Sequence, residues 1–410
     1  MRRQALQLAA RAVERRLNAD DSDAEAPTLP CPCGQHTRYT GRRRKRFETV
    51  LGTLTLERAY YHCARCGHGF CPRDQALGLA EGSLSPGVLR MVAQVGALVS
   101  FQEGSELLAA LAGLRLNAKQ VERTAEALGQ QIAADEQCRV EPPPADKPLP
   151  TLYLGMDGTG IPMRPAELVG RPGKQADGSA KTREAKLCAV WSAEGRDDKG
   201  LAVRDPGSVS YSAAIESAAI RDTDDDYPAF AQRVVREAQR RGFAQAQRQV
   251  ILGDGALWIW NLASEHFPQA IQIVDRFHAK QHVSDAAKAI WGPDSALGRD
   301  WAAERHAELD GGDLEALLSA LRIHQATEPE ARRCFDYLAR NRHRMRYPDF
   351  HRQGLCTSTG VLEAGCKLVV ATRLKRAGMR WTLRGANAIL ALRCAKLSNR
   401  LEEFWLPRAA

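Results

Sequence analysis

Two short apolar runs in the stretch 249–282 each end on an aspartate, and this pattern constrains the fold more than any other part of the chain. Residues 250–252 form the run before Asp254, and residues 271–274 form the run before Asp275. A helix-length segment that closes with a proline separates the two runs. This order predicts parallel neighbouring strands whose carboxyl ends meet at one sheet edge, where ligands of open α/β sheets bind. Two carboxylates at that edge indicate a metal site.

Two more acidic residues extend this pattern. Residues 151–157 alternate in hydrophobicity and end at Asp157, which predicts a strand that delivers a carboxylate. Glu363 lies in a late helix that begins near Thr357, after a long stretch that is helical throughout. Hard cations prefer carboxylate oxygen, and two of them about 4 Å apart activate an attacking oxygen and stabilise a leaving one. Asp157, Asp254 and Glu363 at one edge would therefore suit phosphoryl transfer with two magnesium ions.

The remaining pattern of the second half predicts a mixed α/β domain. Strands are expected at 185–191 and 201–211, and a helix is expected at 227–241. The helix should bury Phe230, Val234 and Val235. Its outward face should carry four arginines, Arg233, Arg236, Arg240 and Arg241. The chain order is then three strands, a helix, two strands separated by a helix, and a helical insertion.

Cysteines concentrate near the N-terminus, which favours a metal site over a disulfide framework. A C-x-C-G knuckle at Cys31 and Cys33 is followed by a C-x-x-C-G knuckle at Cys63 and Cys66. Four thiolates suit tetrahedral zinc and leave no open position for catalysis, so the predicted zinc is structural. Three further side chains compete as ligands, of which the first fits a buried thiol better: Cys71, His62 and His68.

The segment between the knuckles predicts the hairpin of a zinc ribbon, because residues 47–60 alternate around a Gly-Thr turn. The densest basic run of the chain precedes this hairpin and consists of Arg42, Arg43, Arg44, Lys45 and Arg46. The chain as a whole has a formal net charge of +9. A basic run on a small zinc-held module predicts phosphate contacts that position the protein on nucleic acid without specifying sequence.

Residues 85–137 are expected to be helical throughout. A turn at 113–117 separates two helices, with Asn117 as the N-cap of the second, and this has the length of a helix-turn-helix. On that interpretation the second helix presents four side chains to a major groove: Lys119, Gln120, Glu122 and Arg123. The alternative is an ordinary helical hairpin, because such patterns in one sequence are weakly specific.

The proline-rich segment 141–150 can form neither a helix nor a central strand, so it marks a domain boundary. Residues 2–18 predict an amphipathic helix that packs on a neighbour or on a second subunit. No apolar run approaches the roughly 20 residues that span a bilayer, so we expect a cytoplasmic, nucleoid-associated protein without membrane contact. The predicted organisation is 1–29 N-terminal helix and linker, 30–84 zinc ribbon, 85–140 helical DNA-binding region, 141–150 linker, 151–290 first part of the core, 291–356 helical insertion and 357–410 final catalytic helix with C-terminal helices.

Five segments together resemble bacterial insertion-sequence DDE transposases of the ISKra type, which are related to the Mutator-like group. The segments are 154–162 (LGMDGTGIP), 252–261 (LGDGALWIWN), 273–278 (IVDRFH), 360–367 (GVLEAGCK) and 378–381 (GMRW). The resemblance covers most of the chain, including its cysteine-rich part. It implies an α/β fold with a ribonuclease-H-like mixed sheet, interrupted by an all-helical insertion before the last acidic residue. This matches the element order described above.

The resemblance also implies roles for particular residues. The catalytic and magnesium-binding triad falls on Asp157, Asp254 and Glu363, with manganese as an alternative ion. A D-x-x-H signature falls on Asp275 and His278, to which we assign a supporting role. Lys367 and four further basic side chains would line the DNA channel: Arg373, Lys375, Arg376 and Arg380.

The implied activity is metal-dependent hydrolysis at the ends of a mobile element, which frees 3′ hydroxyls, followed by attack of those hydroxyls on target DNA. No covalent enzyme intermediate is expected. The implied partners are the terminal repeats of the element, target DNA and further copies of this chain on DNA. Two alternatives stay open: a ribonuclease-H-like nuclease or resolvase without strand transfer, and a domesticated zinc-ribbon DNA-binding protein with a non-catalytic sheet.

Overall fold

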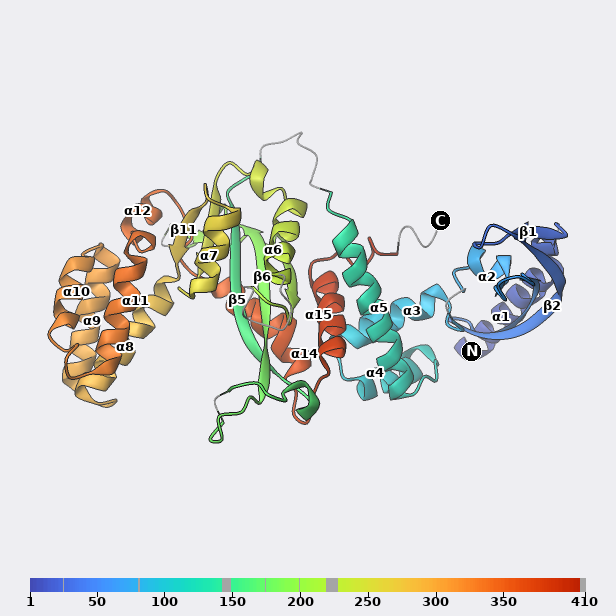
Figure 1. Ribbon diagram of the computed structural model, residues 1–410, viewed down its shortest axis with the longest axis horizontal. Coiled ribbons are helices and arrows are strands. Elements are labelled where there is room, and N and C mark those ends of the chain that lie inside the picture. The colour runs from blue at the N-terminus through green and yellow to red at the C-terminus, as the bar shows by residue number, and fades with distance from the viewer. Residues whose placement is uncertain are drawn as a thin grey trace. The chain divides into compact units, whose positions relative to one another are not determined.

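The computed structural model describes residues 1–24, 26–79, 82–141, 149–173, 175–198, 200–218 and 228–405 (Figure 1). By internal contacts the chain divides into unit 1, Met1–Ile132 with Asn399–Ala410, and unit 2, Ala133–Ser398. The linker predicted at 141–150 falls almost entirely outside the described residues.

An antiparallel sheet forms the N-terminal part of unit 1, with its strands in the order β1, β2, β3, β4. Their bounds are Thr28–Pro30, His36–Thr49, Gly52–His62 and Gly69–Phe70. The predicted hairpin is confirmed, but its strands are longer than expected. The chain turns at Val50 and Leu51, before the expected Gly-Thr position, because Thr49 already pairs with Gly52. The basic run 42–46 therefore lies on β2.

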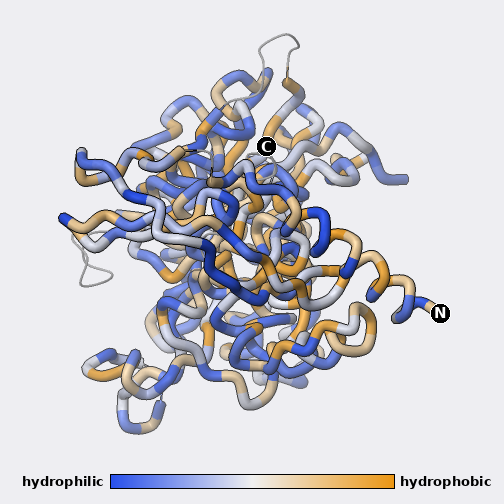
Figure 2. Tube along the Cα trace, turned by 90° about the vertical axis from the view of Figure 1, so that its right-hand side faces the viewer, coloured by the Kyte–Doolittle hydropathy of each residue, from blue (hydrophilic) through white to orange (hydrophobic). Residues whose placement is uncertain are grey.

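Helix α1, Arg2–Ala19, covers the free edge of β3. Strand β3 pairs with β4 only near its end, so its earlier N–H groups need other partners. The N–H of Thr55 donates to Glu14 at 2.6 Å, and the N–H of Glu57 donates to Asn18 at 2.9 Å. The predicted amphipathic helix thus packs on a neighbouring element of its own chain. It mixes hydrophilic and hydrophobic residues along its length (Figure 2).

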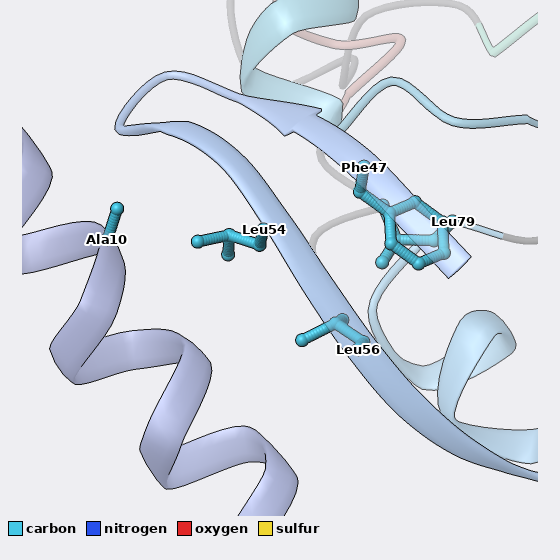
Figure 3. Packing of buried hydrophobic residues seen from close by; sticks show 5 residues of the cluster. All are labelled: Ala10, Phe47, Leu54, Leu56 and Leu79. Carbon is cyan, nitrogen blue, oxygen red and sulfur yellow. The ribbon is translucent and has the colours of Figure 1, made fainter. Parts of the chain in front are cut away.

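The core of this module lies between α1 and the β2–β3 hairpin (Figure 3). It contains Ala10 of α1, Phe47 of β2, Leu54 and Leu56 of β3, and Leu79. Burial of a large apolar side chain contributes about 1.5–3 kcal/mol. The module buries only a few such residues, so its hydrophobic core is small. A bound metal would therefore add substantially to the stability of the module.

The rest of unit 1 is helical, as predicted. Asn117 caps α5, since its side chain accepts from the N–H of Gln120 at 2.9 Å. The turn before it begins at Gly113, whose φ of +73° favours glycine. The helices are α2 Pro72–Ala76, α3 Pro86–Leu98, α4 Phe101–Leu107, the π-helical η2 Leu108–Ala112 and α5 Ala118–Cys138. Two helices joined by a turn are therefore present at the place predicted for a helix-turn-helix.

Unit 2 is built on a mixed sheet with the strand order β11-β10-β5-β6-β9. Strand β10 is parallel to both β11 and β5, whereas β5–β6 and β6–β9 are antiparallel pairs. The bounds are β5 Leu152–Pro162, β6 Thr182–Ser192, β9 Ser210–Ala214, β10 Gln249–Gly253 and β11 Ile271–Val274. The parallel pair predicted around Asp254 and Asp275 is confirmed.

The strand expected at 201–211 needs correction. Ser210–Ala214 forms β9 of the sheet, but the earlier residues form β8, Ala202–Val203. Strand β8 pairs only with β7, Gly195–Arg196, in a separate two-stranded ribbon.

Helices cover both faces of the sheet. Tyr211 and Ser212 are adjacent on β9, so their side chains point to opposite faces. Tyr211 lies against Gly365 of α13, where an added Cβ would be 2.9 Å from its ring. Ser212 accepts from Arg233 of α6, Ala229–Arg240, at 3.2 Å. Helices α13 and α6 therefore lie on opposite faces of the sheet.

The outward orientation predicted for Arg233 is wrong. Its side chain is buried and forms an ion pair with Glu216 at 2.6 Å. The helical pattern placed it among arginines, but the half-buried carboxylate of Glu216, which follows β9, keeps this one inside. Phe230 and Val234 are buried as expected, whereas Val235, also expected to be buried, is half-buried.

The later helices complete unit 2. Helices α8 to α12 gather beyond the β11 edge of the sheet, where the helical insertion was predicted (Figure 1). The bounds are α7 Leu257–His266, α8 Arg276–Trp291, α9 Ala296–Gly311, α10 Leu314–Arg322, α11 Pro329–Asn341, α12 Tyr347–Arg352, α13 Gly360–Gly365, the π-helical η6 Cys366–Ala371, α14 Thr372–Leu374 and α15 Leu383–Leu397. The 3₁₀ turns of the described part of unit 2 are η3 Pro165–Glu167, η4 Phe243–Gln245 and η5 Arg342–Arg344, and the turn η1 Ser22–Ala24 lies in unit 1. In the described part of the chain, no helix has the length and apolar character needed to cross a bilayer.

Candidate metal centre and DNA-binding surfaces

Asp157 lies beside the end of β10, although it does not end its own strand as predicted. Strand β5 continues to Pro162 because its antiparallel pairing with β6 continues, with Asp157 opposite Leu187. On its other side, pairing with β10 stops at Gly155. Asp254 follows the last residue of β10 directly. Two of the predicted carboxylates therefore come from neighbouring parallel strands at the same edge.

Both carboxylate oxygens of Asp157 accept hydrogen bonds. The N–H of Gly158 donates to Oδ1 at 2.7 Å, and the thiol of Cys366 donates to Oδ2 at 3.2 Å. Burial raises the pKa of the Asp157 carboxyl, and the charges of Asp254 and Glu363 act in the same direction. Although the two hydrogen bonds oppose this shift, the pKa stays raised. The three predicted carboxylates thus share one electrostatic environment.

Asp254 is held in a tight turn. Its Oδ1 accepts from the N–H of Ala256 at 2.9 Å, and its main-chain carbonyl accepts from the hydroxyl of Tyr337 at 2.9 Å. The next residue, Gly255, has a φ of +97°, and an added Cβ would lie 2.4 Å from the Tyr337 ring. Sequence patterns did not point to Tyr337, which comes from α11 in the helical insertion.

Glu363 is exposed and belongs to α13. This helix crosses close to β5, since an added Cβ at Gly155 would lie 2.7 Å from Leu362. Gly155 and Asp157 project from the same face of β5 because they are two residues apart. Glu363 and Asp157 are therefore brought to the same face of the sheet. Lys367 is exposed one turn after Glu363, on the same side of the helix.

Asp275 organises two helix starts. Its buried carboxylate accepts from the N–H of His278 at 2.8 Å, which caps α8. The second oxygen accepts from the N–H of Thr359 at 2.5 Å and from the hydroxyl of the same residue. Thr359 is the N-cap residue of α13. The aspartate of the D-x-x-H signature therefore has a structural role. As the N-cap residue of α8, it accepts from the N–H of the residue three positions later.

His278 itself is exposed on α8 and contributes its ring to an aromatic cluster. Its ring centroid lies 5.0 Å from that of His282 and 6.3 Å from that of Tyr337. His282 and Tyr337 are closer still, at 4.0 Å. The supporting residue of the predicted signature is therefore next to the side chain that holds Asp254.

The donor set of the three carboxylates suits a hard divalent cation, because all the available donors are carboxylate oxygens. The oxygens of the three carboxylates are farther apart than the ligand atoms of a closed single-metal site. Among the described residues, only a group of cysteines has all its ligand atoms within 4.8 Å of one another. An open arrangement of this kind suits ions that keep waters or take substrate oxygens as further ligands.

The four predicted zinc ligands converge in unit 1. Cys31, Cys33, Cys63 and Cys66 have all their sulfur atoms within 4.8 Å of one another. Hydrogen bonding from the backbone of Cys66 lowers the pKa of the Cys63 thiol to about 7. For Cys31, hydrogen bonding from the backbone of Cys33 lowers the pKa, but burial and the neighbouring sulfurs outweigh it and raise the pKa to about 12. Cys63 therefore forms the thiolate that metal binding needs more readily than Cys31. This cluster could bind zinc in the tetrahedral thiolate geometry of structural sites.

The competing ligands are not part of this cluster. Cys71 is buried, and its sulfur accepts from the Arg58 guanidinium at 3.1 Å. The same guanidinium pairs with Asp74 at 2.7 Å. Cys71 is therefore a buried structural thiol. His62 and His68 also lie outside the sulfur group among the described residues.

The basic run on β2 splits into paired and exposed side chains. Arg42 bonds Asp21 and Asp23, each at 3.0 Å, and Arg44 bonds Glu57 at 2.5 Å. These pairs hold the N-terminal segment and the hairpin together. The Arg43 guanidinium stacks at 3.5 Å from the Tyr60 ring centroid, and the Lys45 amine lies 4.9 Å from that of Phe47. Arg46 is exposed.

Of the four residues predicted on α5, Lys119, Gln120 and Arg123 are exposed at its first turns, and Glu122 is half-buried. Lys119 pairs with Glu122 at 2.8 Å, and the Gln120 carboxamide accepts from the N–H of Asn117 at 2.9 Å. Gln120 and Arg123 line a pocket of about 680 Å³ together with residues of the ribbon module and Trp405. The surface available to a partner here is concave.

The basic side chains after Glu363 differ in accessibility. Lys375 is exposed and donates to the hydroxyl of Thr159, and Arg380 is exposed. Arg376 is half-buried. Arg373 is completely buried, with its guanidinium 5.2 Å from the Trp381 ring centroid. We therefore correct the assignment of Arg373 to a DNA channel, because a buried cation stacked on an aromatic ring cannot reach phosphate.

Comparisons with known proteins give a family and a distant likeness to solved structures. A family model described as "Uncharacterised protein family (UPF0236)" matches residues 35–402. No curated protein matches the chain. Among solved structures, a chain described as "Drosophila P element transposase strand transfer complex" shares 10% identity, with 81% of this chain and 83% of that chain covered, at a TM-score of 0.28. A TM-score this low does not establish a shared fold.

Proposed function

This chain belongs to the uncharacterised protein family UPF0236, and we propose that it is a metal-dependent DNA transposase of a bacterial insertion sequence. More specifically, we propose that it is a DDE transposase of the ISKra type, because five segments of its sequence resemble the motifs of that family. The observation that carries the proposal is the placement of Asp157 and Asp254 at one edge of neighbouring strands, with Glu363 on a helix that crosses the same face of β5. These three carboxylates come from distant segments of the chain.

The sheet supports a ribonuclease-H-like assignment for unit 2. The first three strands in chain order, β5, β6 and β9, are antiparallel neighbours. The last two, β10 and β11, then add in parallel on the other side of β5. The helical segment α9 to α12 comes between the second acidic residue and the third, where the motif resemblance implies an insertion.

Asp157, Asp254 and Glu363 would hold divalent ions, magnesium or alternatively manganese. We take Asp157 as the central member of the three, since the charges of Asp254 and Glu363 both raise the pKa of its carboxyl. The bound ions would supply charge stabilisation at the attacking and leaving oxygens of a phosphodiester. The residues of this chain supply alignment, because they fix the three carboxylates from separate elements before substrate binds.

DNA is the proposed partner, both as element ends and as target. The exposed cations Arg46, Lys375 and Arg380 are suited to phosphate contacts. Arg42 and Arg44 have intramolecular acidic partners, so their contribution to DNA binding would be smaller. The cysteine cluster would hold structural zinc and keep the basic hairpin folded. We also propose that copies of the chain assemble on DNA, as the family resemblance implies.

A nuclease or resolvase with the same carboxylates is the second candidate function. The zinc-ribbon module, together with the two helices joined by a turn at the predicted helix-turn-helix, favours an enzyme that first binds particular DNA ends. The test is an assay with a labelled DNA fragment that carries the sequences flanking the coding region, together with a supercoiled target plasmid and Mg²⁺. A transposase gives labelled DNA joined to the plasmid, whereas a nuclease gives only free cleaved ends. Absence of both cleavage and joining would reject an enzymatic role.

A further inference from the structure

We propose that Tyr337, in the helical insertion, is a positioning residue that fixes Asp254 for metal binding. This inference rests on the proposed function, because it concerns the same metal centre. Tyr337 belongs to α11, which lies far along the chain from the strand that precedes Asp254.

Two independent contacts join Tyr337 to the turn that carries Asp254. The tyrosine hydroxyl donates to the main-chain carbonyl of Asp254 at 2.9 Å. The ring covers Gly255, where an added Cβ would lie only 2.4 Å from it. A hydrogen bond and a close steric contact at successive residues define the orientation of the peptide between them. The direction of the Asp254 side chain follows from that peptide.

Tyr337 is itself held in place by α8. Its ring centroid lies 4.0 Å from that of His282, in a tilted stack. Such aromatic pairs contribute about 0.5–1.5 kcal/mol beyond burial. The tyrosine is thus fixed between the turn after β10 and a helix that begins at the end of β11.

The insertion is joined by ion pairs to α8, the helix that directly follows β11. Asp310 of α9 pairs with Arg276 at 2.6 Å and with Lys280 at 2.5 Å, both on α8. Helix α11, which carries Tyr337, packs on α8. The position of the insertion therefore determines the position of Tyr337, and through it the geometry at Asp254.

Tyr347 provides a matched control. Its hydroxyl donates to the main-chain carbonyl of Val274 at 3.2 Å, at the end of the neighbouring strand β11. Tyr337→Phe and Tyr347→Phe each remove one phenolic hydroxyl from a tyrosine that bonds the end of a strand. Only the first adjoins a proposed metal ligand.

The experiment is a calorimetric titration of the zinc-loaded full-length chain with Mn²⁺, together with Mg²⁺-dependent cleavage of the flanking-sequence DNA. We expect Tyr337→Phe to raise both the Mn²⁺ dissociation constant and the half-saturating Mg²⁺ concentration by about three- to tenfold, the effect of losing one hydrogen bond. Saturating metal should restore most of the cleavage rate. Tyr347→Phe should match the wild type in both measurements.

The outcomes separate the inference from the proposed function. Wild-type protein that neither binds Mn²⁺ nor cleaves DNA would reject the function. Wild-type protein that does both, with unchanged metal affinity in Tyr337→Phe, would overturn the role of Tyr337 alone. If Tyr337→Phe is unfolded at the assay temperature, Gly255→Ala serves as the second variant, because its Cβ displaces the tyrosine ring. Unchanged metal affinity in Gly255→Ala would also overturn the inference.

Discussion

Asp275 and Thr359 are hydrogen-bonded to each other in the protein interior, so the end of β11 is joined to the start of the helix that carries Glu363. The aspartate also caps α8 through the N–H of His278. A single buried carboxylate thereby sets the positions of two helices next to the proposed metal centre. We propose that Asp275 positions Glu363 in this way, and that Asp254 is the metal ligand of the pair.

Asp275→Asn tests this relationship. An asparagine can still accept from one N–H, but its amide group then faces the N–H of Thr359 as a second donor. We expect a loss of about 1–3 kcal/mol in the free energy of unfolding, measured in urea. Cleavage should fall by about ten- to hundredfold, since Glu363 loses its fixed position. Thr359→Ser keeps both donors and should resemble the wild type, and full cleavage by Asp275→Asn would refute the positioning role.

Cys366 makes a second long-range contact to the site, through its thiol and Asp157. Cys366→Ser keeps a donor, whereas Cys366→Ala removes it, so the alanine variant should cleave DNA several-fold more slowly than the serine variant. The loss corresponds to one hydrogen bond of about 0.5–1.5 kcal/mol. Initial cleavage rates at saturating Mg²⁺ measure the difference. Equal rates for the two variants would show that the thiol has no such function.

The sulfur cluster predicts one zinc ion for each chain. Atomic emission of the purified protein should give this stoichiometry, and Cys63→Ser should lose the metal. Removal of zinc by a chelator should unfold the ribbon module, which has only a small hydrophobic core. Cys71→Ser is the matched control, because Cys71 is buried nearby but outside the cluster. Zinc content that falls as far in Cys71→Ser as in Cys63→Ser would contradict the assignment.

The ion pairs of Asp310 predict a pH dependence of stability. Burial alone would raise the pKa of this carboxyl, but the hydrogen bonds from Arg276 and Lys280 outweigh it, so the pKa is lowered. A lowered folded-state pKa gives stability that is complete above the ordinary value of about 3.9 and is lost as the pH falls through the lowered value. The melting temperature of the wild type should therefore decrease more steeply below about pH 4 than that of Asp310→Asn. Parallel melting curves for the two proteins would exclude this contribution.

The sequence predicted the parts of the site that depend on local patterns. The apolar runs before Asp254 and Asp275 form parallel neighbouring strands, as expected. The cysteine knuckles bring their four sulfurs together, because the turn of each knuckle is specified by its own residues. The Asn117 cap likewise follows from a local signal.

The features that the sequence did not predict depend on contacts between distant segments. Strand β5 continues beyond Asp157 because β6 pairs with it, and no pattern within β5 indicates that pairing. Arg233 is buried because Glu216, in the segment after β9, provides a carboxylate. The contacts of Tyr337 and Cys366 likewise require the folded arrangement of the insertion and of the final catalytic helix.

Cleavage of the flanking-sequence DNA by Asp157→Asn tests the central claim most directly. The variant removes one negative charge and a metal ligand while it keeps the size of the side chain. With Mg²⁺ present, the wild type should produce ends with 3′ hydroxyls, while Asp157→Asn should bind the same DNA with similar affinity and give no detectable cleavage. Magnesium-dependent cleavage by Asp157→Asn at the wild-type rate would contradict the proposed metal centre.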